Sequence, residues 1–338
     1  MLDAIPYPDW IRPEIVPGLP FRWYGLMYLV AFGISYLLFK YQVKRQRLDI
    51  DSDTVMSFFF WGIIGLLVGA RLFATLIFDS SGEYLRKPWL IFWPFGEDFR
   101  FTGFTGMNYY GGLVGALAGC ILYARVKKLD LLEWADMLLA GVPLGYTFGR
   151  IGNFINAELY GRITTAPWGM FFPHARRFPA SEPWVRETAE QAGMTIEPGA
   201  AMVNLPRHPT QLYEAFFEGI FLWLILWFIV RKRRPFKGFT LGAYVIGYGL
   251  VRFVLDYYRM PIRSDFVLKL SSVSNPPYQL VTLWNLSASQ LFSLAMILGG
   301  LVFLLILSHR ERRRSEAEER TEQARVSMRK LRKRIQKD

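Results

Sequence analysis

A run of charged and amide side chains, GRIGNFINAELYGR at Gly149–Arg162, directly follows the apolar stretch Leu131–Tyr146. The apolar stretch is typical of a membrane span. An ionisable side chain at membrane depth costs at least about 2.5–3.5 kcal/mol, so such a group generally faces a polar cavity or a charged partner. The run therefore predicts a polar site at the edge of a membrane span.

Further charged side chains lie inside apolar runs or at their ends. Together with those of the first run they are Arg71, Asp136, Arg150, Glu158, Glu214, Arg252 and Asp256. One such residue would be explained by an ion pair that only holds helices together, or by an arginine whose head reaches the membrane interface. Seven of them favour a functional polar cavity.

Arginines outnumber the acids near this predicted cavity. They are Arg71, Arg150, Arg162, Arg252 and Arg259. A guanidinium group donates bidentate hydrogen bonds to phosphate and stays charged at any working pH. The residues alone therefore predict a site for a lipid phosphate, without specifying a reaction.

The elements that must position these residues are apolar runs long enough, or nearly so, to cross a hydrocarbon core of about 30 Å. We expect seven: Trp23–Leu38, Val55–Ile77, Tyr110–Ala124, Leu131–Phe148, Leu212–Val230, Thr240–Leu255 and Leu286–Leu307. Basic residues follow the first, third and fifth runs and continue into the tail, which are alternate connections. By the positive-inside rule the N-terminus is outside and the C-terminus cytoplasmic. The net charge of +12 is then explained by orientation signals and anionic lipid, and needs no nucleic acid.

The sequence thus predicts an all-α integral membrane protein with seven transmembrane helices. Residues 1–308 form the membrane domain, with an outward arm at about 79–109 and an outward head at about 160–208. The charged tail, 309–338, is expected to be a solvated helix. Three histidines and one cysteine offer no metal-ligand spacing, so we expect no metal and no cofactor. Cys120 is expected to be a packing residue.

The run GRIGNFINAELYGR resembles the signature of the bacterial prolipoprotein diacylglyceryl transferases. Five other blocks resemble that family in the same order: RWYGLMYLV at Arg22–Val30, VGARLF at Val68–Phe73, RHPTQLYEA at Arg207–Ala215, GYGLVRFVLDYYR at Gly247–Arg259 and SQLFS at Ser289–Ser293. The resemblance covers about residues 20 to 305. It implies an enzyme of the bacterial cytoplasmic (inner) membrane, with its active site toward the periplasm. Such enzymes transfer the diacylglyceryl group of phosphatidylglycerol to the lipobox cysteine in the signal peptide of a preprolipoprotein.

The resemblance and the charge argument together give a set of expected roles. The expected catalytic residues are Arg150, Arg252, Tyr110, Glu158 and Asn153. The expected substrate-binding residues are Tyr24, Arg71, Gly161, Arg162, His208, Gln211, Glu214, Asp256 and Arg259. In the implied mechanism Arg150 and Arg252 hold the lipid phosphate while the thiolate attacks the glycerol carbon bonded to it. Glycerol 1-phosphate leaves as a thioether forms.

Two positions depart from the family pattern. Tyr110 stands where the family carries the histidine proposed to act on the thiol, and Asp256 stands for a glutamate. A tyrosine with a reference pKa of about 10 is a poor base at neutral pH, so Glu158 or His208 could take the proton instead. The alternative is a catalytically impaired paralogue that binds or translocates phospholipid.

Overall fold

The computed structural model describes residues 4–18, 21–95, 106–260, 267–272, 278–280 and 282–335. The chain forms two compact units. Unit 1 comprises Met1–Ser35 with Ala135–Asp338, and unit 2 comprises Tyr36–Trp134. The boundaries between them fall within α1 (Trp23–Arg45) and α5 (Leu131–Leu139).

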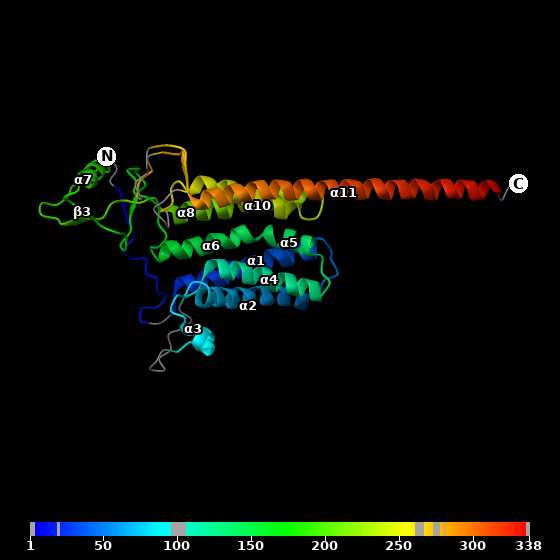
Figure 1. Cartoon of the computed structure of the whole chain (residues 1–338), viewed down its shortest axis with the longest axis horizontal. Helices are drawn as coiled ribbons and strands as arrows, with labels where there is room; N and C mark the ends of the chain where they lie inside the picture. The colour runs from blue at the N-terminus through cyan, green and yellow to red at the C-terminus, as the bar shows by residue number, and fades with distance from the viewer. Residues whose placement is uncertain are drawn as a thin grey trace. The chain divides into compact units, whose positions relative to one another are not determined.

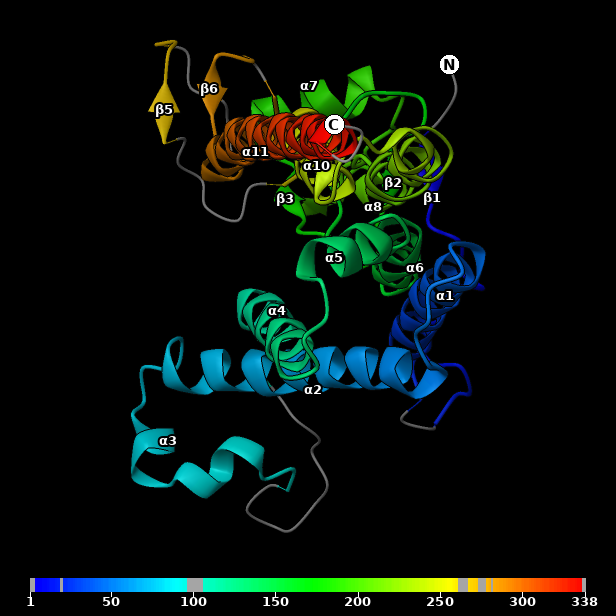
Figure 2. The ribbon, with the colours of Figure 1, turned by 90° about the vertical axis from the view of Figure 1, so that its right-hand side faces the viewer.

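Unit 2 is built on two closely packed helices, α2 and α4 (Figures 1 and 2). Its elements within the described residues are α2 (Ser52–Leu76), α3 (Glu83–Arg86), the 3-10 helix η1 (Pro88–Phe92) and α4 (Tyr109–Val126). A Cβ atom on Gly65 or Gly115 would meet the backbone of the other residue. Small residues at such spacing let two membrane helices approach backbone to backbone. The side chain of Asn108 caps α4 by accepting a hydrogen bond from the N–H of Gly111 at 3.0 Å.

Unit 1 contains further helical segments, several of which are short. They are α6 (Val142–Ile155), α8 (Thr210–Glu214), η2 (Ala215–Phe221), α9 (Leu222–Ile225), η3 (Leu226–Val230), η4 (Arg231–Arg233), α10 (Phe239–Leu255) and α11 (Ala288–Ile335). The segments η2 and η3 have π-helical winding, and Thr210–Arg233 forms one continuous helix. Helices α10 and α11 pack side by side (Figures 1 and 2).

The predicted helix over Leu131–Phe148 is instead two helices, α5 and α6, so the prediction of one continuous helix there is wrong. The break lies at Ala140 and Gly141, and Pro143 is the second residue of α6. Proline lacks an N–H and is tolerated only in the first turn of a helix, where that donor is not needed. The helix that starts there runs on to Ile155 and carries the first half of the charged run.

In the described part of the chain, five helices are long and apolar enough to cross a membrane. They are Trp23–Arg45, Ser52–Leu76, Tyr109–Val126, Thr210–Arg233 and Ala288–Gln323. A further apolar helix, Phe239–Leu255, is shorter. The prediction of a mostly helical membrane protein is confirmed, whereas the count of seven spans and their orientation stay predictions.

Helix α6 packs directly against the helix that contains η2. The hydroxyl of Thr147 donates to the carbonyl oxygen of Ala215 at 3.1 Å. A Cβ atom on Gly219 would collide with the Thr147 side chain, so only glycine permits this approach. The contact places the polar faces of the two helices opposite each other.

The buried acid Asp136 has a structural position in the same unit. Its carboxylate accepts from the N–H groups of Gly238 and Leu241, both at 2.8 Å, where α10 begins. A carboxylate at a helix N-terminus satisfies donors that have no partner in the helix. Asp136 therefore fixes the start of the helix that carries Arg252.

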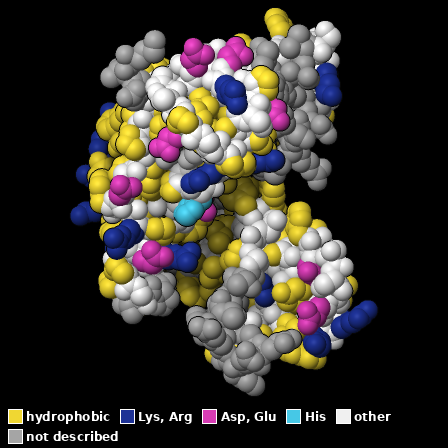
Figure 3. All heavy atoms as spheres, turned by 90° about the vertical axis from the view of Figure 1, so that its left-hand side faces the viewer, with side chains coloured by type: hydrophobic (Ala, Val, Ile, Leu, Met, Phe, Trp, Pro, Cys, Tyr) yellow, Lys and Arg dark blue, Asp and Glu magenta, His cyan; other side chains and the backbone are white. Residues whose placement is uncertain are grey.

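The head region has its own small core. Strand β1 (Ile5–Pro6) pairs with β2 (Met170–Phe171), and β3 (Phe178–Pro179) pairs with β4 (Met202–Val203). Helix α7 (Pro183–Gln191) packs its apolar side into a cluster formed by Ile163, Phe178, Ala180, Val185, Ala189, Val203 and Leu205. Side chains of both charges lie among hydrophobic ones on the face shown in Figure 3. Strand β5 (Leu268–Lys269) pairs with β6 (Asn285–Leu286) just before α11.

The N-terminal segment joins this head to the end of α6. The Tyr7 hydroxyl donates to the carbonyl oxygens of Phe154 and Ile155, at 2.8 and 3.0 Å. Burial raises the pKa of Tyr7 to about 12, so the hydroxyl stays a donor at neutral pH. It satisfies carbonyls that the end of a helix leaves without partners.

Candidate functional site

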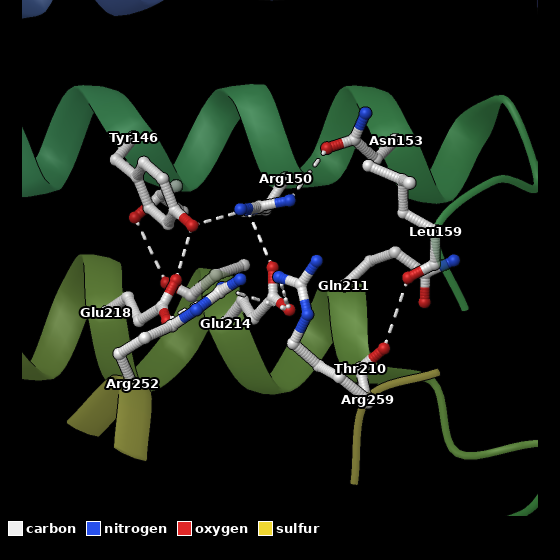
Figure 4. A network of polar contacts seen from close by, with 12 residues as sticks. Tyr146, Arg150, Asn153, Leu159, Thr210, Gln211, Glu214, Glu218, Arg252 and Arg259 are labelled. Carbon is white, nitrogen blue, oxygen red and sulfur yellow. Dashed lines mark hydrogen bonds and ion pairs between the residues drawn. The ribbon is translucent and has the colours of Figure 1, made fainter. Parts of the chain in front are cut away.

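Arginines of α6 and α10 face two buried glutamates of the helix that starts at Thr210 (Figure 4). Arg150 follows Tyr146 by one turn of α6, and both side chains point toward Glu214 and Glu218 (Figure 4). Arg150 Nε lies 2.8 Å from Glu214 Oε2 and donates to the Tyr146 hydroxyl at 2.6 Å. The Tyr146 hydroxyl in turn donates to Glu218.

Helix α10 and the residues after it supply two further arginines. Arg252 Nη1 lies 3.2 Å from Glu218 Oε1 and 3.7 Å from Glu214 Oε1. Arg259 Nη1 lies 2.6 Å from Glu214 Oε1. Glu214 thus contacts three guanidinium groups, and its neighbour Glu218 contacts one.

Burial differs between the two kinds of charge in this cluster. Glu214 and Glu218 are each 1% exposed. The side chains of Arg150, Arg252 and Arg259 keep 15%, 16% and 13% of their surface. A buried acid that lost its cationic partner would cost about 3–5 kcal/mol, so the pairs are mutually required. The cations are the members of the cluster that an entering anion can reach.

Several donors of these arginines do not contact the carboxylates. Within the described residues, no hydrogen-bond partner is found for Arg150 Nη2, or for Nε and Nη2 of Arg252. Guanidinium donors with this fork geometry match phosphate oxygens. The arrangement therefore suits a phosphate group held between two helices.

A second branch of the network leads from Arg150 into the charged run. Arg150 Nη1 is 3.4 Å from Asn153 Oδ1, and Asn153 Nδ2 donates to Glu158 Oε1 at 2.9 Å. Asn156 also donates to Glu158 Oε1, at 3.3 Å. Gln211 Nε2 donates to the Glu158 carbonyl oxygen at 2.6 Å, so Gln211 acts on the backbone of this run.

The backbone of the run then passes between two other segments of the site. The N–H of Gly161 donates to the His208 carbonyl at 2.8 Å, and a Cβ atom on Gly161 would lie 2.9 Å from His208 Cβ. The N–H of Arg162 donates to the Tyr258 carbonyl at 2.8 Å. Glycine is required at position 161 because three segments meet there without room for a side chain.

Two basic side chains near this junction are strongly desolvated. Burial lowers the pKa of the His208 imidazole to about 4, so it is neutral at pH 7. Its Nδ1 lies 3.2 Å from the Tyr213 hydroxyl. Burial also lowers the pKa of Arg162, although the charge of Asp256 opposes that change.

The remaining candidates of unit 1 lie at the edges of this network. Asp256 follows α10 and accepts a hydrogen bond from the Ser287 hydroxyl. Tyr24 is the second residue of α1 and packs on Gly152 of α6, where an added Cβ atom would lie 3.2 Å from the tyrosine ring. The Tyr24 hydroxyl is 3.0 Å from that of Tyr28.

Arg71 and Tyr110 belong to unit 2 and are described within it. Arg71 is 5% exposed and donates to the carbonyl oxygens of Ile91, Leu90 and Gly106. It therefore anchors the arm to α2. Tyr110 lies in the first turn of α4 and is 63% exposed.

Two members of the site, Glu218 and Tyr146, were not among the residues expected from the sequence. Both lie inside apolar runs, where a single polar residue gives little signal. Their spacing was the available clue, because each is four residues from another member, Glu214 or Arg150. Residues four apart share one face of a helix. Gln211 and Glu214 have separate partners, which are the Glu158 carbonyl oxygen for Gln211 and the arginines for Glu214.

The described ranges contain no group of three or more His, Cys, Asp or Glu side chains placed to hold a metal ion. The fold and the site together define a helical, multi-pass membrane protein with a buried, arginine-rich polar site.

The chain belongs to the prolipoprotein diacylglyceryl transferase family, whose pattern it matches over residues 13–306. It is 49% identical over 333 residues to a phosphatidylglycerol–prolipoprotein diacylglyceryl transferase of Treponema denticola, which covers 94% of this chain and 98% of that protein. The Treponema pallidum protein of the same name is 50% identical over 326 residues, covering 92% and 98%. That of Chlorobaculum tepidum is 41% identical over 259 residues, covering 75% and 80%.

These comparisons confirm the resemblance found in the sequence motifs, and the chain is a transferase of lipoprotein biosynthesis. They do not favour the alternative of an impaired lipid-binding paralogue.

Proposed function

We propose that this chain transfers the diacylglyceryl group of phosphatidylglycerol to the lipobox cysteine in the signal peptide of a preprolipoprotein. The cysteine thiolate attacks the glycerol carbon bonded to the phosphate oxygen. A carbon–sulfur bond forms, the carbon–oxygen bond breaks, and glycerol 1-phosphate leaves with the bonding electrons. The names of the relatives and the chemistry of the site support this reaction.

The observation that carries the proposal is the pair Arg150 and Arg252, which buried glutamates hold while other donors of both groups have no partner in the described part of the chain. Charge builds on the phosphate as the carbon–oxygen bond breaks. Fixed donors at that point lower the barrier because they need no reorganisation during the reaction. Asn153 and Glu158 would orient the two substrates from the branch next to Arg150.

The proton of the thiol needs an acceptor other than Tyr110. The thiol has a reference pKa of about 8.5, and nearby arginines lower the pKa of such a group. Glu158 is our preferred acceptor. Its carboxylate is held by Asn153 and Asn156 beside Arg150. His208 is the weaker candidate because burial lowers its pKa to about 4.

We also propose the finer topology. The broken pair α5 and α6 makes one crossing and α10 another, which with the five long apolar helices gives seven. Basic residues on alternate connections support an N-terminus outside and an active site toward the periplasm of a bacterial inner membrane. The regions 79–109 and 160–208 would be the periplasmic arm and head.

The test is a reconstituted assay with purified protein, phosphatidylglycerol and a lipobox peptide, following release of glycerol phosphate. The parent should release it, Arg150→Ala should lose at least about 100-fold in rate, and Tyr110→His should stay active. Exposed Arg177→Ala in the head is the matched arginine control. Full activity of Arg150→Ala would refute the proposed role of the cluster. No release by the parent, with activity in Tyr110→His, would show that the chain needs the family histidine.

A further inference from the structure

A closed ring of side chains joins Arg150 to Arg252 by two separate bridges (Figure 4). In the first bridge Arg150 Nε donates to the Tyr146 hydroxyl at 2.6 Å, that hydroxyl donates to Glu218, and Glu218 Oε1 lies 3.2 Å from Arg252 Nη1. The second bridge is Glu214, 2.8 Å from Arg150 Nε and 3.7 Å from Arg252 Nη1. Two bridges fix a separation that one bridge would leave free to pivot.

We propose that Tyr146 and Glu218 are positioning residues that set the spacing and facing of Arg150 and Arg252 for one phosphodiester group. The proposal rests on the proposed function. Glu218 is 1% exposed and carries the same sign of charge as a phosphate, so it acts through the arginines and does not contact the lipid. The Tyr146 hydroxyl is likewise engaged within the ring, since it accepts a hydrogen bond from Arg150 and donates one to Glu218.

The geometry of a guanidinium group explains why the first bridge matters. The group is planar, so anchoring its Nε edge fixes the direction of the opposite Nη donors. In Arg150 that edge contacts both Tyr146 and Glu214, and the guanidinium carbon lies 4.8 Å from the centre of the Tyr146 ring. A displacement of about 1 Å from the productive position can cost about 100-fold in rate.

The bridge also sets the charge of the cluster. Among the side chains in direct ion pairs, Arg150, Arg252 and Arg259 face Glu214 and Glu218, which leaves one positive charge in excess. Glu158 reaches Arg150 only through Asn153 and lies outside this count. One excess charge matches the single negative charge of a phosphodiester. A phosphomonoester such as phosphatidate carries between about 1.5 and 2 negative charges at pH 7 and is matched less well. Neutralising Glu218 would raise the excess to two charges and favour the monoester.

The experiment measures kcat and KM for phosphatidylglycerol in detergent micelles with a lipobox peptide, and inhibition by phosphatidate. For Tyr146→Phe we expect kcat to fall about 10- to 100-fold with KM within about threefold, because the lost contact acts in the transition state. Phosphatidate inhibition should not change, since the charge is unaltered. For Glu218→Gln we expect a similar fall in kcat and phosphatidate inhibition at least about threefold stronger.

Tyr257→Phe is the matched control, because it also removes one tyrosine hydroxyl hydrogen bond, that to the Leu283 carbonyl at 3.0 Å. Melting temperatures of all variants report on folding. The positioning role is overturned if Tyr146→Phe and Glu218→Gln both keep kcat within about twofold of the control. The charge role is overturned if Glu218→Gln leaves phosphatidate inhibition unchanged. No release by the parent would refute the proposed function instead, so the two failures are distinguishable.

Discussion

At the scale of single residues, the acidic and basic side chains between α6, η2 and α10 have different roles. Glu214 and Glu218 are buried and serve the arginines, whereas Arg150 and Arg252 keep donors for a ligand. An arginine at such a point must contact an internal acid and an external anion at once. Its planar fork presents donors to both at fixed angles, whereas an ammonium group is a compact point charge without that fixed geometry.

Arg252→Lys tests that distinction. A lysine keeps the charge and can pair with Glu218, but it lacks the planar fork that directs two donors at one phosphate. We expect kcat/KM for phosphatidylglycerol to fall about 10- to 100-fold with the melting temperature nearly unchanged. Arg314→Lys, on the exposed tail, is the control. Equal kcat/KM in the two variants would show that charge alone suffices at position 252.

His208 gives a pH-dependent prediction at the same scale. Burial lowers its pKa from about 6.5 to about 4, so the unfolded chain binds a proton at higher pH than the folded chain does. The contribution of His208 is fully present above pH 6.5 and is lost as the pH falls toward 4. Melting temperature should therefore drop less between pH 7 and pH 5 in His208→Asn than in the parent. Parallel curves for the two proteins would contradict the buried, neutral imidazole.

At the scale of elements, the site depends on how closely α6 approaches η2. Gly219→Ala would drive a methyl group into Thr147, and overpacking of this kind costs about 1–3 kcal/mol. We expect a lower melting temperature and lower kcat, because the helices that hold Arg150 and Glu214 must move apart. Gly299→Ala in α11 is the control, since nothing lies within 4 Å of its added Cβ. Thr147→Ala should partly rescue the variant by making room, and an absence of rescue would exclude this contact as the cause.

Sequence patterns predict the helices better than the breaks between them or the long-range strand pairings. Long apolar runs predicted most helices well, because hydropathy and length suffice for membrane spans. The break between α5 and α6 was missed because Gly141 and Pro143 lie inside a continuous apolar run. The pairing of β1 with β2 joins Ile5 to Met170, and no local pattern encodes so distant a contact.

The candidate site was partly predictable for a similar reason. Charges next to membrane spans pointed to Arg150, Glu214 and Arg252, because each is costly without a partner. Which acid pairs with which arginine depends on how three helices are rotated toward one another, and only the structure shows this. Glu218 gives little signal among its aromatic and aliphatic neighbours, although its spacing from Glu214 places it on the same helix face.

At the scale of the whole molecule, α11 continues from an apolar span into an exposed, charged tail, while the family match ends at residue 306. The ion pairs Arg312–Glu316 and Arg314–Glu318 lie within single turns of the exposed helix. Water and salt screen such exposed pairs, so each contributes little. The tail thus offers little to the stability of the membrane part, but its first residues, His309–Arg314, carry basic charges next to a span.

Two truncations separate these parts of the tail. Ending the chain at Arg314 keeps the basic residues and should leave kcat within about twofold of the parent, with unchanged membrane insertion. Ending it at Ser308 removes an orientation signal, so less protein should insert with a cytoplasmic C-terminus, as judged by protease access to a C-terminal tag. Activity per inserted molecule should stay the same in both, because the site residues lie before α11. If the chain ending at Ser308 inserts as well as the chain ending at Arg314, the basic loops earlier in the sequence set the topology alone. If the chain ending at Arg314 already has a lower kcat, the tail supports the enzyme directly.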